Sequence, residues 1–197
     1  MSFKENFKEN GYEIIRNFLD ADFVKFINQY YFIRIAGGAA TLGDTQAPNS
    51  YLFYGDPLMD TILSEFNDTF AKNIGCKLFP TYSYVRLYSQ GDELKIHRDR
   101  PSCEISATLS LGIPEGEEIN PIYFSKNEDK SDAVKILLNP GDLCVYRGPD
   151  LYHWRDPFTQ KWYLQAFLHY VDAEGPNKNS IYDSRPFLGL PESSRVR

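Results

Sequence analysis

The sequence predicts an α+β fold in which helices buttress a rolled antiparallel sheet. From Leu78 onward the period of the apolar residues changes from about 3.6 to about 2, and strand patterns then dominate to about Val171. The helical patterns all lie before this change. Helices followed by a long run of strands are typical of α+β folds, and many antiparallel strands avoid exposed edges by closing into a barrel or a jelly roll.

The N-terminal segment predicts a short strand, a helix and a loop. Residues 11–19, GYEIIRNFL, have the pattern of a short strand. Asp20 can cap a following helix, whose apolar positions recur at helical spacing at Phe23, Phe26, Ile27, Tyr30 and Tyr31. The segment 36–50 is rich in Gly, Ala, Thr and Asn, which favours a mobile loop.

A second helix is expected between Asp56 and Gly75. Asp56 is a good N-cap, Pro57 suits the first helical position, and Gly75 is a typical stop signal. One apolar stripe runs between these signals, at Leu58, Ile62, Phe66, Phe70 and Ile74. We expect both helices to pack against the sheet.

The strand pattern at residues 103–111, CEISATLSL, predicts which face of the sheet is lined by small polar groups. Cys103, Ile105, Ala107, Leu109 and Leu111 fall on one face; Ser106, Thr108 and Ser110 fall on the other. Short hydroxyl side chains on the inner face of a barrel leave a cavity, whereas a closed core needs bulky apolar groups. The segment NPGDLCVYRG (139–148) predicts a tight turn into a strand, and QKWYLQAFLHYV (160–171) predicts a long final strand.

Composition narrows the class of protein. With 197 residues, 42% of them hydrophobic, the chain can bury one substantial core, and a single domain is expected. The net charge of −6 argues against nucleic acid as the main partner. Three cysteines without a CxxC pair indicate reduced thiols, and neither a signal peptide nor a membrane-spanning run is evident, so a cytoplasmic protein is expected.

Two of the three histidines of the chain, together with one aspartate, indicate a metal site. His97 and Asp99 lie two residues apart in predicted extended backbone, so both side chains point to the same face, and His153 follows from a distant strand. Two imidazoles and one carboxylate in this order are what a double-stranded β-helix presents to a single iron, with three positions left open. His169 lacks this setting and is interpreted as a strand histidine whose ring is satisfied by a neighbour.

Three stretches resemble the Fe(II)/2-oxoglutarate dioxygenases, and within them the prolyl 4-hydroxylase-like branch: YSYVRLYSQGDELKIHRDR (82–100), NPGDLCVYRG (139–148) and HWRDPFTQKWYLQAFLHY (153–170). The resemblance implies a cupin-like jelly roll with His97, Asp99 and His153 as iron ligands. It also implies Fe(II), O₂ and 2-oxoglutarate, with ascorbate as an optional reductant. One dioxygenase domain is then expected over 1–197, with support over 1–77, the barrel over 78–171 and a C-terminal extension over 172–197.

The resemblance also implies a cation for the far carboxylate of 2-oxoglutarate, because an unpaired buried carboxylate is costly. In most relatives this cation lies about ten residues past the second histidine. Lys161 is the nearest match on the final strand, although its spacing is short. Arg155 competes, because its side chain is expected to point inward like that of His153. Tyr88 matches a position where relatives place a hydroxyl near the cosubstrate, or is simply one of several strand aromatics.

The activity that this resemblance implies is hydroxylation of a prolyl residue in a peptide or of a small amino-acid-like substrate. Tyr84, Arg86 and Arg100 are candidates to line the mouth of the site. Two alternatives remain open: a non-redox cupin-like binding or isomerase domain, and a nucleic-acid demethylase of the same superfamily. Arg155 and Lys161 form a basic pair that suits the demethylase, whereas the acidic balance of the chain argues against it.

Overall fold

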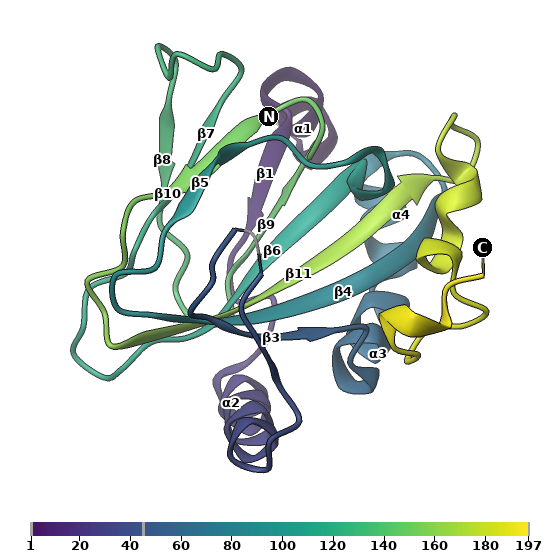
Figure 1. Ribbon diagram of the computed structural model, residues 1–197. Coiled ribbons are helices and arrows are strands. Elements are labelled where there is room, and N and C mark those ends of the chain that lie inside the picture. Colours follow the sequence, from purple (N-terminus) through teal and green to yellow (C-terminus); the bar gives the residue numbers. More distant parts are fainter. Residues whose placement is uncertain (1, 45, 197) are drawn as a thin grey trace.

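Two antiparallel sheets form the frame of the protein, as seen in a computed structural model that describes residues 2–44 and 46–196 (Figure 1). The large sheet has the strand order β1-β9-β6-β11-β4-β3-β2 and the small sheet the order β5-β10-β7-β8. The strands are β1 (Tyr12–Ile15), β2 (Thr41–Leu42), β3 (Tyr51–Tyr54), β4 (Leu78–Ser89), β5 (Leu94–His97), β6 (Ile105–Gly112), β7 (Ile122–Ser125), β8 (Val134–Ile136), β9 (Leu143–Tyr146), β10 (Tyr152–Arg155) and β11 (Trp162–Asp172). This arrangement confirms the predicted α+β class with a rolled antiparallel sheet.

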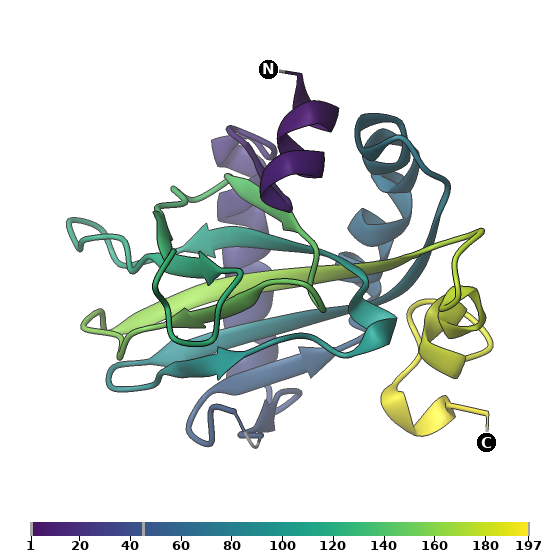
Figure 2. The same cartoon turned by 90° about the horizontal axis from the view of Figure 1, so that it is seen from above.

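The helices cover the face of the large sheet that points away from the small one, whereas the C-terminal segment packs against β4 and the helix Pro57–Glu65 (Figures 1 and 2). The helical elements are α1 (Phe3–Asn10), α2 (Ala21–Ala36), α3 (Pro57–Glu65), α4 (Asn67–Ile74) and the 3₁₀ turns η1 (Pro101–Cys103), η2 (Lys178–Ser184) and η3 (Glu192–Ser194). Within the described residues, no helix is both long and apolar enough to cross a membrane.

The outer face of β6 belongs to the main core, as the strict alternation of its sequence predicts. Its apolar residues Ile105, Ala107, Leu109 and Leu111 are buried in the same cluster as Ile27 of α2. Ser106, Thr108 and Ser110 point the other way, toward the space between the two sheets, and are fully buried. The sheet therefore keeps small polar groups on the face that the small sheet covers.

The sequence signals for α2 are confirmed at its start but not over its whole apolar face. Asp20 caps the helix by accepting a hydrogen bond from Phe23 N at 2.8 Å. Ile27 and Tyr31 are fully buried, whereas Phe26 is 58% exposed. Phe26, one of the apolar residues at helical spacing, faces solvent because the helix turns the side of Val24 toward the sheet.

The single helix predicted from Pro57 to Ile74 is two helices in the structure. Its caps are confirmed: Asp56 accepts from Leu58 N, and Gly75 takes the left-handed conformation that ends α4. Between them Phe66 has φ −90° and ψ 1°, which separates α3 from α4. The apolar stripe continues across this break, so periodicity alone gave no sign of it.

The segment predicted as a mobile loop, residues 36–50, is partly ordered by the sheet. Thr41 and Leu42 form β2 and pair with β3, so the prediction was wrong for these two residues. Further along, the Asp44 carboxylate pairs with the buried guanidinium of Arg86 and accepts a hydrogen bond from the Tyr84 hydroxyl at 2.6 Å. A local composition rich in Gly, Ala, Thr and Asn does not predict long-range contacts of this kind.

We expect Phe70→Ala to lower the free energy of unfolding by about 3–5 kcal/mol. The Phe70 ring is fully buried and packs between Phe18 and Tyr170, with ring centroids 5.7 and 5.5 Å away, so its removal leaves a cavity. Phe26→Ala is the matched control and should change stability by less than about 0.5 kcal/mol, because that ring is exposed. Urea denaturation followed by circular dichroism measures both values, and equal losses would contradict this assignment of the core.

Candidate active site

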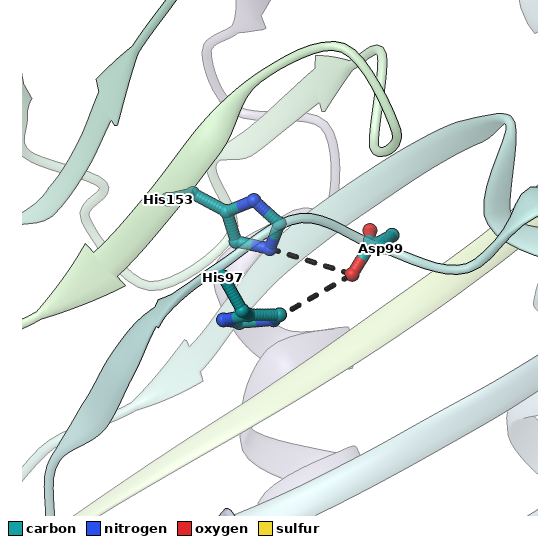
Figure 3. Close-up of side chains that lie close together, drawn as sticks. All are labelled: His97, Asp99 and His153. Carbon is teal, nitrogen blue, oxygen red and sulfur yellow. Dashed lines mark ion pairs between the residues drawn. The ribbon is translucent and has the colours of Figure 1, made fainter. Parts of the chain in front are cut away.

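His97, Asp99 and His153 meet between the two sheets (Figure 3). His97 ends β5 and His153 lies in β10, and the two strands pair so that these residues are directly opposite each other. Asp99 follows two residues after His97 and brings its Oδ1 to 3.6 Å from His97 Nε2 and 3.4 Å from His153 Nε2. One ligand atom from each of the three residues lies within 4.8 Å of the others, which is the spacing of groups that can share one metal ion.

Both imidazoles are held in the tautomer that suits a metal. His97 Nδ1 lies 2.8 Å from the carbonyl oxygen of Lys95, and His153 Nδ1 lies 3.0 Å from that of Leu151. A carbonyl only accepts hydrogen bonds, so each Nδ1 carries a proton, and in the neutral ring each Nε2 keeps its lone pair. The two Nε2 atoms are the ones that face Asp99.

The Asp99 carboxylate is held by Ser106, which lies on the inner face of the large sheet. The Ser106 hydroxyl donates a hydrogen bond to Asp99 Oδ2 at 2.8 Å and also lies 2.9 Å from His169 Nδ1. The alternation of the strand sequence places Ser106 on the inward polar face, but no local sequence signal predicts its contact with Asp99. His169 is buried with its ring partnered by Ser106, which confirms its interpretation as a satisfied strand histidine.

The environment keeps Asp99 ionised and His169 neutral. Burial by itself would raise the pKa of Asp99, but the adjacent His153 and His97 hold that pKa well below its usual value. Burial lowers the pKa of His169 to about 4, despite the nearby Asp99 charge. A divalent cation requires an ionised carboxylate and imidazoles whose Nε2 atoms carry no proton, and the three residues can supply this donor set.

A pocket of about 350 Å³ opens onto this cluster. Its walls include the three candidate residues Tyr84, Arg86 and Arg100, in agreement with the prediction that they line the mouth. Register explains the arrangement of the aromatic wall: Tyr82 and Tyr84 of β4 lie opposite His169 and Phe167 of β11. The pocket therefore has a flat aromatic side from the large sheet and a polar side next to the histidines.

The three residues considered for the cosubstrate lie in different surroundings. Arg155 is 2% exposed and points inward from β10, with its guanidinium 5.0 Å from the ring centre of Tyr163. Lys161 is exposed and precedes the first residue of β11. Tyr88 is fully buried, stacked on Phe158 with ring centroids 4.5 Å apart.

Arg155 has unused donors in a buried place. Its Nη1 donates to the carbonyl oxygen of Asn120 at 2.7 Å. Among the residues that the structure describes, its Nε and Nη2 have no hydrogen-bond partner, and neither does the Tyr163 hydroxyl. A buried charge without partners is costly, so these donors fit an anionic group that the chain itself does not provide.

Comparison with known proteins finds relatives by structure only: no family model and no curated protein matches the sequence. A prolyl-4-hydroxylase from Pseudomonas putida superposes with a TM-score of 0.69 at 16% identity, over 86% of this chain and 97% of its own. The 2-oxoglutarate-dependent epimerase SnoN from nogalamycin biosynthesis superposes with a TM-score of 0.71 at 15% identity, over 99% and 94%. The chain has the fold of the prolyl-4-hydroxylase-like 2-oxoglutarate-Fe(II) oxygenases. This confirms the jelly roll expected from the sequence.

The structural neighbours of this oxygenase fold differ in what they bind. A prolyl hydroxylase from Trichoplax adhaerens, in complex with a peptide fragment of hypoxia inducible factor, superposes with a TM-score of 0.66 at 17% identity, over 87% of this chain and 88% of its own. Epimerization in SnoN and prolyl hydroxylation in the Pseudomonas enzyme show that one fold supports several outcomes. Substrate and reaction must therefore be argued from the pocket of this chain.

Proposed function

We propose that this chain is an Fe(II)- and 2-oxoglutarate-dependent hydroxylase, with His97, Asp99 and His153 as its iron ligands. The observation that carries the proposal is the convergence of two oriented Nε2 atoms and one ionised carboxylate at the base of a pocket. Iron bound there, together with 2-oxoglutarate and O₂, supplies the oxidation of a substrate C–H bond coupled to loss of CO₂. The likeness of the fold to known oxygenases supports the proposal.

The protein's own residues would bind and orient the reactants. We assign the far carboxylate of 2-oxoglutarate to Arg155, because its buried guanidinium has unused donors two residues beyond His153 on the same face of β10. The Tyr163 hydroxyl, also unpartnered among the described residues, is placed to add a second donor beside it. Lys161 is exposed and would have to leave solvent to take this role. Tyr88 contributes a wall next to Phe158 in this assignment.

The substrate class that we propose is a prolyl residue in a peptide or a small amino-acid-like molecule. The structural neighbour that holds a peptide fragment of hypoxia inducible factor supports a peptide substrate. A pocket of about 350 Å³ accommodates one ring-sized group beside the iron ligands. A cytoplasmic location and a single catalytic domain complete the proposal.

Succinate formation tests the proposed function directly. Protein, Fe(II) and 2-oxoglutarate are incubated with proline peptides, free amino acids and methylated nucleotides, in air and under argon, and succinate is measured by NMR. We expect succinate that depends on O₂ and rises with a peptide or an amino acid. A protein that binds iron but forms no succinate in air would favour the non-redox alternative, and stimulation by methylated nucleotides alone would favour the demethylase.

Ser106→Ala should weaken Fe(II) binding by about 10- to 100-fold, because the hydroxyl that orients Asp99 Oδ2 is lost. Ser110→Ala is the matched control on the same strand face, since no hydrogen-bond partner of its hydroxyl is found among the described residues. Competition with a fluorescent chelator measures both affinities. Identical affinities for the two variants would show that Asp99 does not need this partner.

A further inference from the structure

In the outer part of the pocket, an aromatic wall lies next to the half-exposed guanidinium of Arg100. Tyr82, Tyr84 and Phe167 present rings from the inner face of the large sheet. Arg100 lies against this wall, with its guanidinium carbon 4.8 Å from the ring centre of Tyr82, and its side chain is 46% exposed. A flat wall next to a planar cation suits a ligand that has both a flat body and an anionic group.

Arg100 is held in place from the C-terminal segment. Its Nη2 donates to Asp183 Oδ2 at 2.8 Å, and the side chain of Asp183 is only 7% exposed. The Tyr54 hydroxyl donates to the same carboxylate, and Arg195 pairs with it as well. A guanidinium has five N–H donors, so the contact with Asp183 leaves donors of Arg100 for a ligand in the pocket that it lines.

The conformation around Asp183 is strained, which makes its position specific. Tyr182, Asp183 and Ser184 all have positive φ values, of 54°, 54° and 62°. This conformation is uncommon for residues other than glycine. The contacts of Asp183 with Tyr54, Arg100 and Arg195 hold the turn in place.

Most of the charges around the pocket are paired within the chain. Asp44 is paired with Arg86, and Asp99 faces the two histidines. Asp183 contacts the guanidinium groups of both Arg100 and Arg195, and Arg195 also pairs with Glu192. The half-exposed guanidinium of Arg100 would attract an anionic ligand group, whereas a second cation there would be repelled.

The position of Arg100 separates it from the proposed cosubstrate site. Arg100 comes one residue after Asp99, whereas Arg155 lies two residues beyond His153 on β10 and does not line the pocket. A dicarboxylate that reaches from the metal site to Arg155 leaves Arg100 free. This argument rests on the proposed function, which assigns Arg155 to 2-oxoglutarate.

We propose that the substrate carries a carboxylate on a flat apolar body, that Arg100 binds this carboxylate, and that Asp183 positions Arg100. The planar fork of a guanidinium matches the two oxygens of a carboxylate. The rings of Tyr82, Tyr84 and Phe167 then contact the body of the substrate and place a C–H bond next to His97 and His153.

Two probes of the same shape test the proposal: phenylacetate and phenylacetamide, which differ in charge. Each is titrated calorimetrically into protein that is loaded with Fe(II) and 2-oxoglutarate under argon. We expect phenylacetate to bind at least about tenfold more tightly, the size of a partly exposed charge-assisted contact. Arg100→Gln should remove this preference. Lys135→Gln, an equal charge change at an exposed site outside the pocket, should keep it.

Asp183→Asn tests the positioning role. It should weaken phenylacetate binding several-fold and leave phenylacetamide binding unchanged, because only the charged probe uses Arg100. An equal loss for both probes would overturn the positioning role and leave Asp183 a purely structural residue.

The proposal for Arg100 is overturned by equal binding of the two probes, by a preference that persists in Arg100→Gln, or by no binding of either probe. It is also overturned if phenylacetate displaces 2-oxoglutarate, which would be seen as release of the dicarboxylate. Iron and 2-oxoglutarate loading are measured first. Failure to load contradicts the proposed function and the inference with it, whereas a loaded protein without a carboxylate preference contradicts the inference alone.

Discussion

His97→Ala and His153→Ala are each expected to reduce bound Fe(II) from about one ion per chain to near zero. Each variant leaves only one imidazole and the Asp99 carboxylate, and two protein ligands cannot retain a labile divalent ion against water. Metal analysis after gel filtration under argon gives the stoichiometry.

The third histidine provides the control for this experiment. His169→Gln keeps a polar group near Ser106 and should retain the iron, because His169 is not one of the three grouped ligands. Unchanged stoichiometry in both alanine variants would rule out the proposed metal centre. Loss of iron in all three variants would point to a general effect on the fold, which circular dichroism would reveal.

Arg155→Gln is expected to raise the KM for 2-oxoglutarate by about 30- to 1000-fold while iron binding remains. The lost contact is a buried charge-assisted pair, worth about 2–4 kcal/mol. Lys161→Gln makes the same charge change at an exposed position and should have little effect. The opposite ranking would transfer the role to Lys161.

A second measurement tests whether Arg155 binds the far carboxylate even if the Arg155→Gln variant is less stable. 2-Oxovalerate has the keto acid end of 2-oxoglutarate but lacks the far carboxylate. Wild-type protein should prefer 2-oxoglutarate strongly, and Arg155→Gln should bind the two compounds with similar affinity. A preserved preference in Arg155→Gln would show that another cation holds the far carboxylate.

Local patterns determined much of the framework. The alternation in β6 set which residues face the helices and which face the space between the sheets, because a strand sends successive side chains to opposite faces. Asp56 and Gly75 marked the ends of the helical region, because both act through backbone groups within a few residues of themselves. The His97 and Asp99 pair was visible for the same reason, since two residues apart in extended backbone means one shared face.

Tertiary structure decided the features that depend on distant segments. Phe66 separates α3 from α4 although the apolar stripe runs through it, so no local period records the break. Our proposal of Arg155 rather than Lys161 for the cosubstrate rests on such placement: Lys161 precedes β11 and is exposed, whereas Arg155 is buried in β10.

The proposed metal site and its surroundings show the same division between local pattern and tertiary structure. The sequence by itself determined which residue types were available and which faces they share, because periodicity and capping act over a few residues. Only the fold brought His153 opposite His97, Ser106 onto Asp99, and Asp183 onto Arg100. These pairs join residues from separate elements, and their contacts exist only once the two sheets and the C-terminal segment have packed together.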